Sequence, residues 1–333
     1  MQKFHCVFYD IPISPHRGFI SPHNHNDATG SDPVGLFLRL LLIGMIMKFK
    51  DANVLITGGA SGIGRIMGRM ALEKGAARLI IWDINESNIE LVKNELSSKG
   101  QVSGYRVDVS DKKVIEEAYA ATEKECGQVD IVIQCAGIVT SNATFDKLTT
   151  PDIERTMMIN AIAPMNVAHV ILPDMIKRDK GHICNIASAA GMLSMPKMSV
   201  YAASKWSVIG WSDSVRIELH DMKSKVRFTT VAPYFINTGM FDGVASPIFP
   251  ILDPENTARK IIRSIERNKN FRGIPFGFHF IRLMEAILPS WLFDFVFGTI
   301  FGIYHTMDHF TGRKNDNRKH PGDKNSGNPE VAA

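Results

Sequence analysis

A regular alternation of short apolar runs with longer helical stretches, which begins at Ala52, is the strongest constraint on how this chain folds. Most of the runs are continuously apolar and rich in β-branched residues, as expected for strands that a parallel sheet buries on both faces. Helices that connect such strands cover the two faces of the sheet. The pattern therefore predicts an α/β fold with a doubly wound parallel sheet of the Rossmann type.

The predicted elements follow one another without an internal repeat. The predicted strands are NVLIT ending at Thr57, RLIIWD ending at Asp83, VSGYRVD ending at Asp108, VDIVIQ ending at Gln134, HICNIA ending at Ala187, VRFTTVA ending at Ala232, and residues 271–274. Helices are predicted over residues 63–74, 86–98, 111–125, 151–178, 200–222 and 255–268. Together they predict a single domain over residues 48–275, followed by an apolar C-terminal helical extension over residues 276–310.

The two ends of the chain differ in composition from this domain. Residues 1–33 are rich in Pro, His, Asn and Ser, which predicts a poorly ordered leader. Residues 311–333 form a tail rich in Lys, Asn, Gly and Pro that we expect to be disordered.

Between the leader and the domain lies the apolar segment 34–47. It has 14 residues, is interrupted by Arg39, and is shorter than the roughly 20 residues that span a bilayer. It also lacks the layout of a signal peptide, because the leader before it is long and no small-residue cleavage site follows. Three interpretations stay open: a membrane-surface anchor, a helix packed on the domain, or an extension upstream of a true start at Met47.

Composition and charge exclude several classes of partner. The chain is 45% hydrophobic and 22% charged, which is typical of a globular protein. Its net charge of +4 is small, and no dense basic block is interleaved with aromatic residues, so no nucleic-acid partner is expected. The four cysteines contain no C-x-x-C pair, which argues against a zinc site and a disulfide framework and favours reduced, cytoplasmic surroundings. Four histidines lie in the leader and are interpreted as solvated loop residues, so no metal is expected.

The segment TGGASGIG follows the first predicted strand directly and opens the first helix. Its glycines let the backbone approach a pyrophosphate, and the helix N-terminus supplies free N–H groups and the positive end of a dipole. A Gly-rich turn alone is a weak signal, because plain strand-to-helix turns look similar. Its position after a strand favours a dinucleotide site, with these predicted binding residues: Thr57, Gly58, Ser61, Gly62, Ile63 and Gly64.

Two carboxylates end the next two predicted strands. Asp83 stands 19 residues after Gly64, where a carboxylate accepts hydrogen bonds from the adenosine ribose and repels a 2′-phosphate. This position favours NAD over NADP as the cofactor, although Arg65 beside the loop is a cation that would pair with a phosphate. Asp108 is predicted to contact the adenine edge, with a strand-end or helix-capping role as the alternative.

A second cluster of polar residues is predicted at the carboxyl edge of the sheet, where open α/β sheets bind ligands. Tyr201 and Lys205 of YAASK are four residues apart and share a helix face. Ser188 follows a predicted strand, and Asn160 lies inside the helix before that strand. A tyrosine of pKa about 10 is a poor base near neutrality, so a cation such as Lys205 is needed to stabilise its phenolate. Ser188 would then donate to a substrate oxygen, and Asn160 would hold a water that links Lys205 to solvent.

TGGASGIG, Asn160, Ser188 and YAASK, in this order and spacing, resemble the short-chain dehydrogenase/reductase family over roughly residues 50–275. The resemblance implies that Tyr201 is the catalytic acid/base, that Lys205 lowers its pKa and holds the nicotinamide ribose, that Ser188 orients the substrate, and that Asn160 belongs to the proton relay. It also implies cofactor contacts by these residues: Ala136, Gly137, Asn160, Tyr201, Lys205, Pro233 and Thr238.

Two positions depart from the pattern of that family. Its Asn-Asn-Ala-Gly segment reads Gln134, Cys135, Ala136, Gly137 here, and its Pro-Gly is Pro233-Tyr234. The first departure affects hydrogen bonding near the ribose. The second places a large aromatic ring beside the nicotinamide. Neither removes a reacting group.

A narrower resemblance lies near the C-terminus, where PYFINTGMFDG and YHTMDHFTGRK are similar to the retinol dehydrogenase and 17β-hydroxysteroid dehydrogenase branch. The resemblance implies an NAD(H)-dependent enzyme of lipid metabolism that interconverts an apolar alcohol, such as a retinoid, steroid or long-chain alcohol, and its carbonyl. It also implies a homodimer or homotetramer, and a cytoplasmic protein with peripheral membrane contact. Two alternatives are a dinucleotide-binding scaffold or sensor without turnover and a nucleotide-sugar epimerase. The intact reacting groups disfavour the scaffold, and the apolar extension does not resemble the sugar-nucleotide domain of an epimerase.

Residues 276–310 carry more Phe, Leu, Ile and Trp than a surface tail normally exposes. Pro289 divides them into two segments, each too short to span a bilayer. One interpretation is that both segments pack on the sheet and extend the core. The other is that they wall the substrate entrance and rest on a membrane surface.

Overall fold

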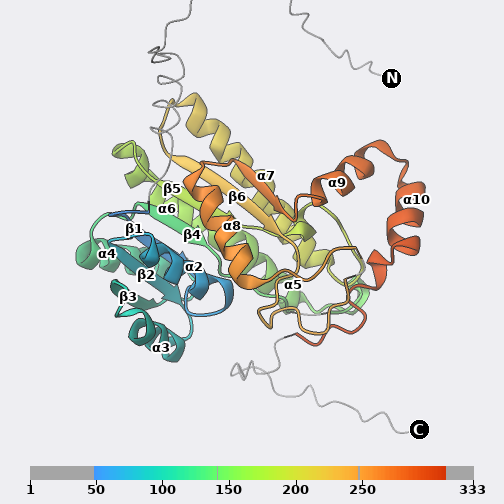
Figure 1. Cartoon of the computed structure of the whole chain (residues 1–333), viewed down its shortest axis with the longest axis horizontal. Coiled ribbons are helices and arrows are strands. Elements are labelled where there is room, and N and C mark those ends of the chain that lie inside the picture. The colour runs from blue at the N-terminus through green and yellow to red at the C-terminus, as the bar shows by residue number, and fades with distance from the viewer. Residues whose placement is uncertain (1–48, 141, 247, 313–333) are drawn as a thin grey trace, which may run out of the picture. The chain divides into compact units, whose positions relative to one another are not determined.

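The computed structural model describes residues 49–140, 142–246 and 248–312 (Figure 1). The predicted leader, the apolar segment 34–47 and nearly all of the predicted tail lie outside the described residues, so these predictions remain predictions. The domain itself is built on a seven-stranded parallel sheet of strand order β3-β2-β1-β4-β5-β6-β7. Its strands are β1 (Asn53–Thr57), β2 (Arg78–Asp83), β3 (Gln101–Arg106), β4 (Ile131–Gln134), β5 (His182–Ile186), β6 (Arg227–Pro233) and β7 (Phe271–Ile274).

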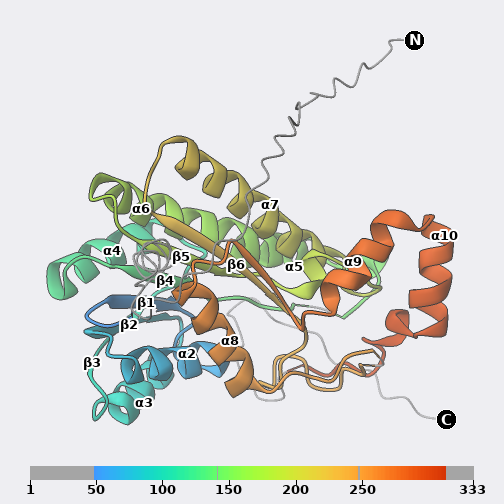
Figure 2. The same ribbon diagram turned by 45° about the horizontal axis from the view of Figure 1, so that its top comes forward.

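Helices cover both faces of the sheet, as predicted (Figure 2). Successive residues of a strand point to opposite faces of the sheet: Val54 packs in one core cluster and Leu55 in the other. α2 (Gly62–Glu73), α3 (Glu86–Leu96) and α8 (Pro254–Glu266) pack in the first cluster. α4 (Lys112–Cys126), α6 (Ala163–Lys177) and α7 (Ser199–Asp221) pack in the second. The strand order reverses beside β1, between its neighbours β2 and β4, and this crevice at the carboxyl ends is where such sheets bind ligands.

The helix predicted over 151–178 is interrupted in the middle. It consists of α5 (Thr150–Met157), a π-helical turn (Met158–Ile162) and α6. By length and composition the run Thr150–Lys177 is apolar enough to cross a membrane, but it is a core helix here, because Val167 and Ile171 are fully or almost fully buried. A widened π turn is often found at functional sites, and this one contains Asn160.

The C-terminal extension is helical, as predicted. α9 (Phe278–Ile287) and α10 (Ser290–Phe293), which continues into a π-helical stretch (Asp294–Ile300), form an arm beside the sheet (Figure 2). One side of the arm is buried in a third apolar cluster, through Phe278 and Ile281. The same cluster contains Tyr201, so the extension packs against the part of the domain that holds the predicted catalytic residue.

Candidate active site

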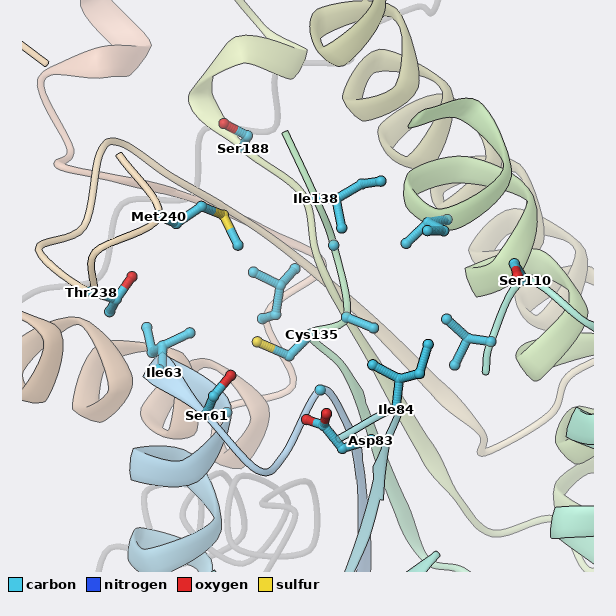
Figure 3. Close-up of a pocket in the computed structure, with 18 of the residues that line it drawn as sticks. Ser61, Ile63, Asp83, Ile84, Ser110, Cys135, Ile138, Ser188, Thr238 and Met240 are labelled. Atoms are coloured by element: carbon cyan, nitrogen blue, oxygen red, sulfur yellow. The ribbon is translucent and has the colours of Figure 1, made fainter. Parts of the chain in front are cut away.

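A cavity of about 870 Å³ opens at the carboxyl ends of the strands, and most of the predicted site residues line it. Figure 3 shows Ser61 and Asp83 at one end of this cavity and Ser188 at the other. The predicted residues on its wall are Gly58, Ser61, Gly62, Ile63, Gly64, Asp83, Asp108, Ala136, Gly137, Ser188, Tyr201, Lys205, Pro233 and Thr238. Thr57 and Asn160 are not on the wall and lie buried behind it.

The Gly-rich loop has the shape that a pyrophosphate needs. Gly58 has a φ of +67°, and a Cβ there would lie 2.9 Å from the Cα of Ala136. At Gly64 a Cβ would overlap the carbonyl oxygen of Gly58. Ser61 begins α2 without a side-chain capping hydrogen bond, so the first N–H groups of the helix face the cavity region without that partner. These residues fit the phosphates of a dinucleotide, because backbone donors at a helix N-terminus bind anions.

Asp83 is held in place by the backbone of this loop. Its carboxylate accepts hydrogen bonds from Ala60 N and Asn85 N, both at 3.0 Å. A carboxylate has about four acceptor sites, so it keeps capacity for ribose hydroxyls. Arg65 is paired with Glu95 on α3, which places its guanidinium in an ion pair and away from the cavity wall.

Asp108 has the hydrogen bonds of one of the two alternatives left open by the sequence, the strand-end role. It lines the cavity, but β3 ends two residues before it, and its carboxylate accepts hydrogen bonds from the backbone and hydroxyl of Ser110 at 2.9 and 2.6 Å. The strand-end role is therefore visible in the hydrogen bonds. The predicted adenine contact remains a prediction.

Thr57 supports the site from behind. Its hydroxyl oxygen accepts hydrogen bonds from Cys135 N at 3.2 Å and Ala136 N at 3.3 Å, which ties the end of β1 to the end of β4. Cys135 lies on the cavity wall, and burial raises the pKa of its thiol to about 12. The thiol is therefore protonated at neutral pH. In the same segment, Gln134 is buried, and its Nε2 group has no hydrogen-bond partner among the residues that the structure describes.

Asn160 is fully buried in the π turn, and its amide is used within the protein. Oδ1 accepts from Ile138 N and Nδ2 donates to Ile138 O, both at 2.8 Å, while Nδ2 also donates to Ser204 Oγ at 3.3 Å. Both amide hydrogens are thus engaged. The side chain of Asn160 therefore holds the segment after β4, and its predicted part in a proton relay remains a prediction.

The predicted catalytic residues converge at the other end of the cavity. Tyr201 and Lys205 lie one turn apart on α7, and Ser188 follows β5. Burial raises the pKa of Tyr201 to about 12, against a hydrogen bond with Ser188 that lowers it. Burial also lowers the pKa of Lys205 to about 8. Burial is thus the larger effect on the tyrosine pKa and Ser188 is the group that opposes it, while the expected lowering by Lys205 remains a prediction.

Lys205 nevertheless has a defined position in the site. Its ammonium donates a hydrogen bond to Ile186 O at 3.1 Å. A Cβ added to Gly137 would lie 3.6 Å from the Lys205 nitrogen and 3.3 Å from Asn160 Oδ1. Glycine at position 137 thus keeps the space between these two groups open.

Sequence reasoning missed part of the cavity wall. Met240 and Phe241 line it beside Tyr234, and Ile138 lines it beside Ser188. Their apolar side chains carry no chemical motif, and they reach the cavity through loops whose course depends on distant contacts. Among the described residues, no group of three or more His, Cys, Asp and Glu residues is arranged to hold a metal ion.

Comparisons with known proteins identify the family and the fold. The short chain dehydrogenase family matches residues 52–247. Epidermal retinol dehydrogenase 2 of Mus musculus is 34% identical over 271 residues, which cover 78% of this chain and 85% of the relative. Estradiol 17-beta-dehydrogenase 11 of Homo sapiens is 32% identical over 256 residues, which cover 76% of this chain and 85% of that protein. The solved structure of levodione reductase has the same fold, with a TM-score of 0.63 at 24% identity over 69% of this chain and 98% of that one.

The chain belongs to the short-chain dehydrogenase family, within the retinol and 17β-hydroxysteroid dehydrogenase branch. It is accordingly an oxidoreductase that acts on alcohol or carbonyl groups and binds a nicotinamide dinucleotide. The Gly-rich loop of this structure fits the phosphates of that cofactor.

Proposed function

We propose that this protein is an NAD(H)-dependent oxidoreductase that interconverts an apolar secondary or primary alcohol, such as a retinoid, steroid or long-chain alcohol, and its carbonyl. The observation that carries the proposal is the convergence of Tyr201, Ser188 and Lys205 on one end of a cavity whose other end bears Asp83. The two ends fit a hydride-transfer site and an adenosine site.

In the proposed reaction the substrate oxygen lies between the hydroxyls of Ser188 and Tyr201. In oxidation Tyr201, as phenolate, removes the hydroxyl proton of the alcohol while the carbinol carbon loses a hydride. The nicotinamide supplies the hydride acceptor, and the reduced form supplies the hydride in the reverse direction. Ser188 stabilises charge on the oxygen, and Lys205 binds the ribose and favours the phenolate electrostatically. The proton taken up by Tyr201 then passes to solvent by way of Lys205 and a water held at the turn that contains Asn160.

NAD is the proposed cofactor because of the charges at the adenosine end. The Asp83 carboxylate lines this end of the cavity and would repel a 2′-phosphate. Arg65, the cation that the sequence offered to such a phosphate, is paired with Glu95. Both features favour a cofactor with a free ribose 2′-hydroxyl.

An apolar substrate is supported by the wall beside the catalytic tyrosine. Tyr234, Met240 and Phe241 line the cavity, and the ring of Phe241 packs edge-on against that of Tyr201. The Tyr234 hydroxyl accepts a hydrogen bond from Ser246 at 3.0 Å, so its polar group already has a partner. The relatives named as retinol and estradiol dehydrogenases support the same class of substrate.

The alternative is a dinucleotide-binding scaffold without turnover, for which the Gln134-Cys135 segment is the one hint. An assay of NADH formation by the purified full-length chain separates the two proposals. The panel would contain retinoids, steroids, long-chain alcohols and short secondary alcohols, each with NAD and with NADP. Turnover above that of Tyr201→Phe supports the enzyme, whereas tight NADH binding without turnover of any alcohol or carbonyl supports the scaffold.

We further propose a homodimer or homotetramer formed through the helices 150–177 and α7. Exposed apolar side chains favour such packing, including Ile217 on α7 and Met222 at its C-cap, which are 56% and 55% exposed. Light scattering of the purified protein tests this, and a monomer would contradict it.

Peripheral membrane contact, with the protein on the cytoplasmic side, is the proposed localisation. The C-terminal arm supports it, because one face of the arm is apolar and exposed. Phe280, Leu283 and Ile287 are spaced at three or four residues on α9, Trp291 follows on α10, and each is more than half exposed.

A further inference from the structure

Residues 303–312, which we call the strap, tie together loops that surround the catalytic tyrosine. Asn142 Nδ2, in the segment after β4, donates to Met307 O at 2.8 Å. Lys197, in the segment before α7, forms an ion pair of 2.8 Å with Asp308. These contacts join the last described part of the chain to two segments that are distant in sequence.

The strap also crosses the loop that follows β6, residues 234–246, which we call the β6 loop. Thr311 N donates to Asp242 O at 2.9 Å, and Ala245 N donates to Thr306 O at 3.1 Å. Backbone hydrogen bonds on both sides of the crossing fix the course of the β6 loop relative to the strap.

Gly243 permits the two segments to cross this closely. Its φ is +81°, and a Cβ at this position would overlap the carbonyl oxygen of His309. Any other residue would be strained in this backbone conformation and would push the segments apart. The crossing therefore depends on one glycine.

Phe241 connects this crossing to the catalytic centre. Its ring lies 6.3 Å from that of Phe310 in the strap and 5.0 Å from that of Phe235. On its other side it meets Tyr201 in a T-shaped arrangement, with ring centroids 6.0 Å apart and planes at 79°. Phe241 also lines the cavity. It therefore packs against the strap and is available to a substrate that binds beside Tyr201.

We propose that Phe241 is a specificity-determining residue for the alcohol and that Phe310 of the strap is its positioning residue. The inference rests on the proposed function and names the feature of the substrate that the site selects: an extended apolar group next to the carbinol carbon. Such a group gains apolar contact with Phe241 and the neighbouring Met240. A short polar alcohol reaches Tyr201 and Ser188 but gains nothing from this wall.

The experiment uses the full-length chain and the substitutions Phe241→Ala, Phe310→Ala and Phe310→Leu. Phe276→Ala is the matched control, because Phe276 is 83% exposed and does not line the cavity. The kcat and KM of each variant are measured for a long-chain secondary alcohol and for 2-propanol, with saturating NAD. Binding of the same two alcohols to the enzyme–NADH complex is measured by calorimetry, which needs no turnover. NADH affinity and melting temperature report on the fold.

Phe241→Ala is expected to lower kcat/KM for the long-chain alcohol about tenfold, mainly through KM, and to change that for 2-propanol by less than about threefold. Phe310→Ala is expected to give a smaller loss in the same direction, and Phe310→Leu to restore most of it. If Phe241 and Phe310 had a purely structural role, these substitutions would instead lower kcat/KM for both alcohols and the affinity for NADH together.

An unchanged ratio between the two alcohols in Phe241→Ala, or an equal loss in Phe276→Ala, overturns the inference while the proposed reaction stands. If the wild type turns over no alcohol or carbonyl, the proposed reaction fails, and calorimetry then decides the inference alone. If the wild type binds the long-chain alcohol preferentially and Phe241→Ala abolishes this preference, the inference is supported. If the wild type and Phe241→Ala bind that alcohol equally, the inference is overturned.

Discussion

The ammonium of Lys205 lies 5.7 Å from the centre of the Tyr201 ring, one turn along α7, and both side chains are more than nine-tenths buried. Burial moves their pKa values in opposite directions, upward for the phenol and downward for the ammonium. Both shifts favour the neutral forms. A phenolate at Tyr201 therefore needs stabilisation beyond what the folded chain supplies by itself.

Replacing Tyr201 with phenylalanine should lower kcat by at least two to four orders of magnitude and leave NADH affinity within about threefold, because it removes the proton-transfer group and retains the ring. Stopped-flow turnover and fluorescence titration with NADH measure the two quantities. Substantial residual turnover would exclude Tyr201 as the acid/base.

Replacing Lys205 with methionine should abolish turnover yet stabilise the fold by about 1–3 kcal/mol at pH 7. The pKa of Lys205 in the folded protein, about 8, lies below its ordinary value of 10.5. Between these two pH values the unfolded chain therefore binds more protons than the folded protein. The cost of the buried ammonium is fully present below pH 8 and fades as the pH rises towards 10.5.

Urea unfolding of the wild type and of Lys205→Met at pH 7 and pH 10 measures this pH dependence. The gain in the free energy of unfolding from Lys205→Met should be smaller at pH 10 than at pH 7. Lys113→Met is a control, because the Lys113 side chain is 82% exposed, and it should change stability little at either pH. A variant that is less stable than the wild type at pH 7 would contradict the prediction.

Replacing Asp83 with asparagine should narrow the preference for NAD over NADP by about tenfold or more, since it removes the charge that repels a 2′-phosphate. Asparagine keeps one acceptor for the backbone hydrogen bond from Ala60, so the Gly-rich loop should stay folded. Arg65→Ala is the control: because Arg65 is paired with Glu95, its loss should leave NADP affinity nearly unchanged. Kd values for NADH and NADPH measure both effects. A wild type that prefers NADPH would refute the role assigned to Asp83.

A triple substitution of Phe280, Ile287 and Trp291 by serine should reduce flotation with phosphatidylcholine vesicles several-fold. The three side chains are 60%, 63% and 70% exposed, so their removal should leave the melting temperature unchanged. This test is cleaner than removal of the whole arm, because Phe278 and Ile281 on the same helix are buried in the core. Leu91→Ser, at a leucine of 65% exposure on α3, is the control. Equal flotation of all three proteins would leave core packing as the role of the arm.

The first interpretation of residues 276–310, core packing, describes one side of α9. Phe278 and Ile281 extend the core, as the first interpretation expects, while the opposite side of α9 exposes Phe280 and Leu283. The sequence shows that both sets are apolar, and only tertiary contacts decide which set faces the domain. The membrane interpretation of the exposed set remains a prediction.

The sequence alone determined the parallel sheet, the place of the Gly-rich loop, and the residues Ser188, Tyr201 and Lys205 near one sheet edge. It could do so because strand and helix periods and short motifs are local properties of the chain. It did not determine the π turn, which uses the side chain of Asn160 for hydrogen bonds within the protein.

Only the tertiary structure decided how Phe241 meets Tyr201 and how strongly burial shifts the catalytic pKa values. Phe241 is 40 residues from Tyr201 and about 70 from Phe310 along the chain, and no local pattern relates the three. Their contact depends on the crossing of the strap and the β6 loop at Gly243, and these two segments are far apart in the sequence. Desolvation likewise depends on every element packed around a group, so it follows from the folded arrangement and not from the identity of the residue.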